Sequence, residues 1–233
     1  MSISQNYAYM QQKIADELGD RTDLLAPLAD NNALNSPIQD AIQSAIALWE
    51  REPFYFLESY EPFLNLVAGQ EFYTTTDAAA IATAPRIVQL RVMVNGQRYG
   101  LTPRDWQYLE ETSVNPQVTS SYPSDWAYYA ETLRFYPIPS QALPIQASYD
   151  QRLANLVEGG DSNVWTQDGY DLIKEQAKLT LARGTLHSES IADACLKALY
   201  GTPGIRGERG YVNVLKQETA RRSGRARVRP SYF

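Results

Sequence analysis

The spacing of apolar residues changes character twice along this 233-residue chain, and these two changes limit what it can fold into. Apolar residues recur at helical spacing before Pro53 and again after the Gly159-Gly160 pair. Between these points, short runs of aromatic and β-branched residues alternate with turn residues, which is the pattern of strands. The chain is therefore predicted to be an α+β protein.

Two helices are predicted before Pro53. The first covers about residues 4–18 and stops at Gly19. The second begins at Ser36, where Ser36 and Gln39 fit a capping box and Pro37 takes the first helical position. It should end near Arg51, and its buried stripe consists of Ile38, Ile42, Ile46 and Trp49.

The middle region is predicted to be antiparallel sheet built from hairpins, with Asn95-Gly96 as the strongest turn signal. A short capped helix is expected to begin within residues 102–105 and to carry Trp106 and Leu109. The expected hairpins join 64–67 to 71–74, 88–94 to 97–101, and 126–130 to 133–136, and a further strand covers 145–149.

Beyond the Gly159-Gly160 pair, helices are predicted over about 167–185, 188–200 and 211–220, with a flexible glycine-bearing connector before the last. The predicted organisation has three parts. Segments 1–53 and 160–220 form a helical bundle, 54–159 form the inserted β-hairpin-rich region, and 221–233 form an extended basic C-terminal arm.

The arm carries the clearest functional signal. The chain has a net charge of −6, and removing the five arginines of the arm leaves −11 on the preceding 220 residues. An acidic body resists adhesion to nucleic acid, whereas a basic segment with aromatic residues can pair with carboxylates and fill a groove on a partner. The candidate partner-binding residues are Arg221, Arg222, Arg225, Arg227, Arg229, Tyr232 and Phe233.

Catalytic sites receive less support from the sequence. His187 and Cys195 are too far apart along a helix for a direct hydrogen bond, so no nucleophile pair is assigned. A wall hydrolase using carboxylates stays an alternative, with Glu110, Glu111, Asp161 and Asp168 as possible members. We predict that the protein is not an enzyme and assign no catalytic residue.

A nucleic-acid-binding module is a second alternative. The aromatic stretch from Tyr122 to Tyr136 contains a single basic residue, Arg134, which favours core strands and tyrosines at a subunit interface over base stacking. The glycines and arginines of 204–210 lack the Lys-Ser/Thr ending of a phosphate-binding loop.

Metals, cofactors and membranes are not expected partners. One histidine and one cysteine cannot build a zinc site within the chain, and no cofactor motif is present. No apolar stretch reaches the length of a spanning helix, and residues 1–10 do not resemble a secretory signal, so we expect assembly in the cytoplasm.

Several local phrases, in this order, resemble the head-to-tail adaptor (connector) proteins of tailed bacteriophages, especially those with short tails. The resemblance extends over about residues 36–200. The phrases are the helix end Leu48–Tyr55, the Ala68–Tyr73 hairpin, the Leu133–Pro139 run and the Asn163-Val164-Trp165 helix entry.

This resemblance implies a virion protein of the neck between head and tail. Its copies would form a ring, usually a dodecamer, beneath the portal protein. The ring would extend and seal the DNA channel, let genomic DNA pass without sequence-specific binding, and hold the tail nozzle or tail tube protein. The basic arm would then dock on the portal.

Overall fold

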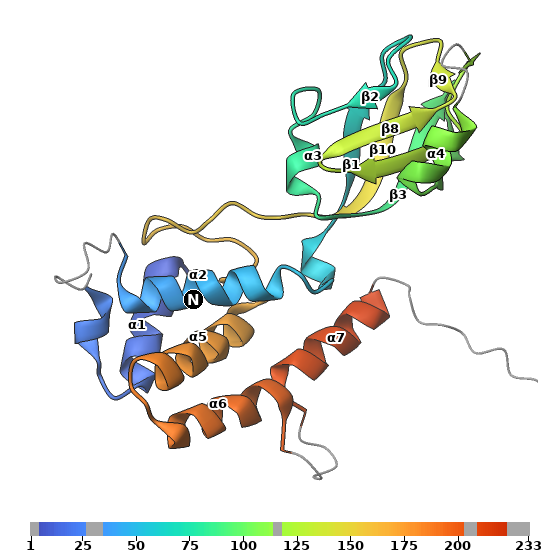
Figure 1. The fold of residues 1–233 in the computed structure, drawn as a ribbon. Coiled ribbons are helices and arrows are strands. Elements are labelled where there is room, and N and C mark those ends of the chain that lie inside the picture. The colour runs from blue at the N-terminus through green and yellow to red at the C-terminus, as the bar shows by residue number, and fades with distance from the viewer. Residues whose placement is uncertain (1–4, 27–34, 114–117, 203–208, 223–233) are drawn as a thin grey trace, which may run out of the picture. The chain divides into compact units, whose positions relative to one another are not determined.

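The computed structural model describes residues 5–26, 35–113, 118–202 and 209–222. Its helices and sheets confirm the α+β class (Figure 1). The chain forms two compact units, with Met1–Phe56 and Ala154–Phe233 in unit 1 and Leu57–Leu153 in unit 2. Among the described residues, no helix is long and apolar enough to cross a membrane.

Unit 1 is helical, with α5 packed against α1, α2 and α6, and α7 packed against α5 and α6. Ile14, Ile42 and Ile173 are fully buried in these contacts. The helical elements are α1 (Tyr7–Glu17), η1 (Thr22–Leu25), α2 (Pro37–Trp49), η3 (Tyr55–Leu57, which continues into unit 2), α5 (Tyr170–Gly184), α6 (Glu189–Tyr200) and α7 (Tyr211–Arg222).

The predicted start of α2 is confirmed in detail. Ser36 Oγ accepts a hydrogen bond from the Gln39 N–H at 3.2 Å, and Gln39 Oε1 accepts one from the Ser36 N–H at 2.9 Å. This reciprocal pair satisfies two backbone donors that a helix start leaves unpaired. Trp49 closes the helix and is buried, as its stripe predicted.

Unit 2 contains two four-stranded sheets, in the orders β1-β10-β3-β4 and β2-β8-β7-β5, and the pair β6-β9. Buried residues of both four-stranded sheets meet in one core, among them Leu90, Ile145, Leu133 and Phe135. The elements are β1 (Glu58–Asn65), β2 (Phe72–Tyr73), α3 (Ala80–Thr83), β3 (Arg86–Val94), β4 (Gln97–Gly100), β5 (Thr102–Pro103), α4 (Trp106–Thr112), β6 (Thr119–Ser120), β7 (Asp125–Tyr129), β8 (Thr132–Tyr136), β9 (Ile138–Pro139) and β10 (Pro144–Asp150).

Two of the three predicted hairpins are confirmed. β3 pairs with β4 across Asn95-Gly96, both of which have positive φ, and β7 pairs with β8 across Ala130-Glu131, one residue before the turn at Glu131-Thr132 that the sequence predicts. The second turn also needs positive φ at both residues, although neither is glycine. The predicted strand at 145–149 is confirmed as part of β10.

The predicted hairpin between 64–67 and 71–74 is wrong. The turn itself forms, because the Gln70 N–H donates to the Val67 carbonyl at 3.1 Å and Gly69 has a φ of +80°. The flanking strands do not pair with each other, since β1 pairs with β10 and β2 pairs with β8 in the other sheet. A local turn reverses the chain without choosing the strand partners.

Three other predictions need correction. The middle region is not entirely antiparallel, because β5 pairs with β7 and β6 with β9 in parallel. Thr102 and Pro103 form β5, so the short helix α4 begins at Trp106. The last helix continues beyond Ala220 to Arg222. The central part of the glycine connector, 203–208, lies outside the described residues.

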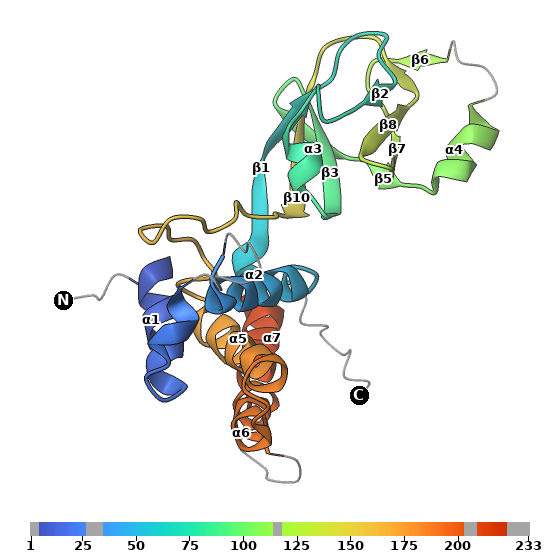
Figure 2. The same ribbon diagram turned by 60° about the vertical axis from the view of Figure 1, so that its left-hand side comes forward.

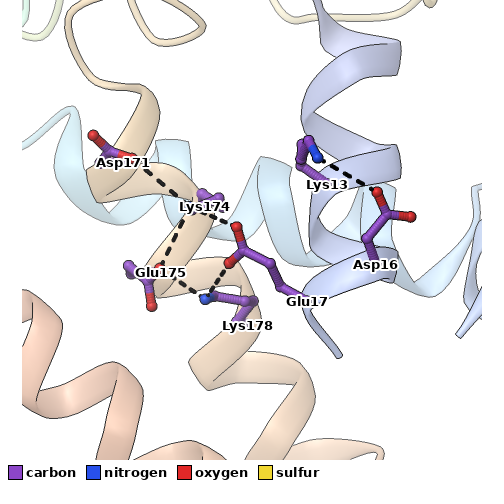
Figure 3. A network of polar contacts seen from close by, with 7 residues as sticks. All are labelled: Lys13, Asp16, Glu17, Asp171, Lys174, Glu175 and Lys178. Atoms are coloured by element: carbon purple, nitrogen blue, oxygen red, sulfur yellow. Dashed lines mark hydrogen bonds and ion pairs between the residues drawn. The ribbon is translucent and has the colours of Figure 1, made fainter. Parts of the chain in front are cut away.

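A network of ion pairs between side chains joins α1 to α5 (Figure 3). The carboxylate of Glu17 accepts hydrogen bonds from Lys174 Nζ at 2.9 Å and Lys178 Nζ at 2.6 Å, and Lys178 also pairs with Glu175 at 2.7 Å. Burial alone would raise the pKa of Glu17, but the bonds from Lys178 and Lys174 outweigh burial and lower it below the ordinary 4.5.

This network predicts an acid-sensitive contribution to stability. Because the folded pKa of Glu17 is lowered, its contribution is present above about pH 4.5 and is lost as the pH falls through the folded value. In thermal unfolding, Glu17→Gln should be less stable than the wild type at neutral pH, and the difference should shrink on acidification. Exposed Glu189→Gln is the control; a Glu17→Gln difference that does not depend on pH contradicts the assignment.

A second prediction concerns neighbouring residues of α2, since Trp49 is 6% exposed and Leu48 is 47% exposed. Trp49→Ala should lower the free energy of unfolding of unit 1 by about 3–5 kcal/mol, because it removes a buried ring and leaves a cavity. Leu48→Ala should cost less than about 1 kcal/mol. Urea denaturation of both variants measures this, and equal small losses would show that the buried face of α2 is misassigned.

Candidate partner-binding site

The described structure includes the root of the predicted docking arm. Arg221 and Arg222 occupy the last turn of α7 and are helical, which corrects the expectation that the extended arm begins at residue 221. Their charge suits a helix C-terminus, where carbonyl groups without helical partners leave a partial negative charge. The other candidate residues, Arg225, Arg227, Arg229, Tyr232 and Phe233, lie outside the described residues.

The end of α7 is fixed to the segment that follows α2. The Arg222 guanidinium lies 4.0 Å from the centroid of the Tyr55 ring, a cation–π contact. Thr219 Oγ1 accepts a hydrogen bond from the Tyr55 N–H at 3.1 Å, and Lys216 pairs with Glu52 at 3.0 Å. The root of the arm is therefore held by three contacts to residues 52–55.

Tyr55 has a further partner in unit 1. Its hydroxyl donates to Asp168 Oδ1 at 3.2 Å. Burial raises the pKa of Tyr55 above its usual value, and the negative charge of Asp168 raises it further. The phenol therefore stays protonated at neutral pH and keeps donating this bond.

The carboxylates considered for a hydrolase have structural partners. Glu110 pairs with Arg134, and Glu111 accepts a hydrogen bond from Gln107 Nε2 at 3.1 Å. Asp161 accepts bonds from the N–H groups of Val157 and Glu158, both at 2.8 Å, and these lower its pKa. With Asp168 bound to Tyr55, none of the four carboxylates is assigned a reacting partner.

The remaining candidates for catalysis or ligand binding are Cys195, His187 and Arg209. Cys195 is buried, and burial raises the pKa of its thiol to about 11, so the thiolate that a nucleophile requires is scarce at neutral pH. His187 is exposed. Among the described residues, no group of three or more His, Cys, Asp and Glu side chains could hold a metal ion. In the possible phosphate cradle, Arg209 is described and donates to Gln217 Oε1 at 2.5 Å.

The aromatic stretch of unit 2 divides between core and surface. Trp126 and Phe135 are buried, whereas Tyr128 and Tyr129 are exposed. Arg134, the single cation that base stacking would have used, is 4% exposed and therefore cannot reach a phosphate. The aromatic stretch thus lacks the accessible positive charge that a nucleic-acid platform needs.

Buried Arg134 instead lies against a group of rings, of which Phe72 and Tyr129 are exposed and Trp106 is half-buried. Its guanidinium lies 5.2 Å from the Phe72 ring centroid and 5.8 Å from the Trp106 centroid, and the Trp106 and Tyr129 centroids are 5.7 Å apart. Phe72 and Tyr129 are 43% and 64% exposed. We call Phe72, Trp106 and Tyr129 the aromatic platform. Aromatic side chains that are fixed at a surface are typical anchors of protein interfaces.

Two carboxylates fix Arg134 in place. Arg134 Nε donates to Glu71 at 2.6 Å, and Nη1 donates to Glu110 at 2.7 Å. Nη2 donates to Ser113 Oγ. These partners come from the residue before β2 and from the C-terminal end of α4, so one guanidinium joins the edge of the sheet to this helix.

Sequence reasoning missed this platform. Phe72, Trp106 and Tyr129 come from β2, α4 and β7, and no local pattern relates them. The available signal was Arg134 itself, a lone cation between the apolar residues Leu133 and Phe135. A buried charge requires partners, so its position indicates that carboxylates from elsewhere must meet it.

The Arg134 cluster predicts a large difference between two arginines of unit 2. Arg134→Ala leaves Glu71 without its charge partner and should lower the free energy of unfolding by about 3–5 kcal/mol. Exposed Arg98→Ala should change it by less than about 0.5 kcal/mol. Chemical denaturation followed by tryptophan fluorescence tests this, and a small effect of Arg134→Ala would show that the cluster does not support the fold.

Comparison with known proteins adds an independent finding. The family model described as SU10 adaptor protein matches residues 5–229, which includes both units and most of the basic arm. A search among curated proteins finds no match.

Proposed function

The chain belongs to the SU10 adaptor protein family, whose members are structural proteins of phage particles, and from this premise we propose that it joins the head of the virion to the tail. In this proposal the protein lies in the neck, where copies of the subunit form a ring of twelve beneath the portal protein. The ring presents an attachment surface for the tail nozzle or tail tube protein. The match over residues 5–229 is the observation that carries this proposal.

The charge of the chain suits passage of DNA through such a ring. Outside the five arginines of the arm the chain carries a net −11, and a like charge keeps the DNA backbone from adhering to the channel wall. Genomic DNA would then pass without sequence-specific binding. The proposal requires neither catalysis nor a cofactor, because an adaptor acts through its interfaces.

We further propose that the basic arm docks on the portal. The contacts of Arg222 and Thr219 with Tyr55 support this role, because they give the arm a fixed point of departure at the end of α7. The arginines beyond this root can pair with carboxylates, and Tyr232 and Phe233 can fill apolar pockets. Binding of the arm to the portal would couple subunit assembly to the portal ring.

Deleting residues 223–233 should abolish binding to the cognate portal while leaving the subunit folded. The cut preserves α7 through Arg222 and therefore keeps the contacts to Tyr55. A second variant, Arg225→Ser with Arg227→Ser and Arg229→Ser, keeps the length of the arm and should weaken binding at least about tenfold. Binding is measured by native mass spectrometry of subunit and portal, and folding by circular dichroism.

The matched control is Ser231→Ala, which leaves the charge and the aromatic anchors of the arm unchanged. Unimpaired joining of the deletion variant to the portal would refute the role of the arm. If the wild-type subunit itself ignores the portal, the adaptor function proposed here fails.

A further inference from the structure

Unit 2 is a sandwich whose two sheets present outward faces of different chemistry. Core residues from both sheets, such as Val92 and Leu133, fill the space between them. Side chains that alternate with these core residues point away from the core on either side. The sheet with β1, β3 and β10 and the sheet with β7 and β8, next to α4, can be followed separately in Figure 2.

Around Arg91 and Arg98, the outward face of the first sheet is basic. Arg91 alternates with the buried residues Leu90 and Val92, and Arg98 pairs with Met93 on the neighbouring strand, so both arginines lie on this face. The Arg98 guanidinium lies 6.0 Å from the centroid of Tyr60, which is 50% exposed. Within the described part of the chain, neither arginine has an ion-pair partner. We call Arg91, Arg98 and Tyr60 the basic face.

The outward face of the second sheet is aromatic and acidic. In the register of β8, Arg134 pairs with Phe72 and alternates with core residues Leu133 and Phe135, which places the aromatic platform on the outer side. Glu71 and Glu110 share the single guanidinium of Arg134, so this cluster keeps one excess negative charge. Two further carboxylates are exposed next to these residues in the sequence: Glu131 lies in the β7–β8 turn two residues after Tyr129, and Glu111 follows Glu110 on α4.

These two faces complement each other but lie on opposite sides of one unit. They therefore cannot meet within a copy, whereas the basic face of one copy can meet the platform of another. A contact between two different surfaces is heterologous and forms a closed ring when the rotation between copies closes. Guanidinium groups also bind to the electron-rich faces of aromatic rings, which the platform exposes.

We propose that the basic face of each copy binds the aromatic platform of the next copy. This inference rests on the proposed function, because it names the contact by which the adaptor ring closes. Arg91 and Arg98 pair with the excess negative charge of the platform, and Tyr60 packs against its rings. The fixed position of Trp106 above Arg134 means that little side-chain freedom is lost on binding.

The test is a charge-reversal exchange in the full-length protein. Arg91→Glu with Arg98→Glu should raise the concentration for half-maximal ring formation on the portal at least about tenfold, because like charges then face each other. Glu111→Arg with Glu131→Arg should do the same from the other side. A chain with all four substitutions should recover ring formation, since the reversed faces again attract each other.

Ring formation is counted by native mass spectrometry or electron microscopy, and binding of single copies to the portal is measured separately. Arg183→Glu, an exposed charge reversal in α5, is the control for negative charge added outside the two faces. If the wild type closes rings and both double reversals close them equally well, the proposed interface is wrong while the adaptor function stands. If both double reversals fail and the fourfold variant does not recover, the two faces do not pair with each other, which also overturns the proposal. If wild-type copies do not bind the portal at all, it is the adaptor function that fails.

Discussion

The helical unit depends on an aromatic cluster at the point where the β-rich unit is inserted. Phe54 and Phe56 precede the insertion, Trp165 follows it, and the Trp165 ring centroid lies 6.3 Å from Phe54 and 5.2 Å from Phe56. Trp165 is fully buried. Because the two halves of unit 1 are separated by residues 57–153, they must find each other across a long loop, and burial of large rings at its two ends offsets the entropy of closing it.

In the second unit, the corresponding interaction is the polar cluster around the buried side chain of Arg134. Burying a charge costs free energy unless its hydrogen-bonding groups are satisfied, and Arg134 meets this condition with Glu71, Glu110 and Ser113. The same guanidinium lies against the rings of Phe72 and Trp106. An interaction that stabilises the unit thereby also shapes the surface through which we propose that copies meet.

Local chemistry explains which parts of the fold the sequence could predict. The capping residues of α2 and the Asn95-Gly96 turn act over a few residues, and both predictions are confirmed. The first hairpin failed because β1 pairs with β10, whose residues lie about 85 positions further along the chain, and a turn at Gly69 carries no information about that choice. The aromatic platform was not predicted for the same reason: it depends on a long-range contact, because Arg134 and Glu71 are 63 residues apart.

The position of Tyr55 links the two proposed roles of the chain. Its backbone N–H and its ring hold the end of α7, where the basic arm begins, and it lies two residues before unit 2 starts at Leu57. A partner that binds the arm therefore acts on a helix that contacts the short segment entering the β-rich unit as well as α5 and α6. If the arm binds the portal and unit 2 binds the next copy, this segment connects the helix that carries the arm to the unit that carries the second interface, which gives portal binding and ring closure a physical route by which to influence each other.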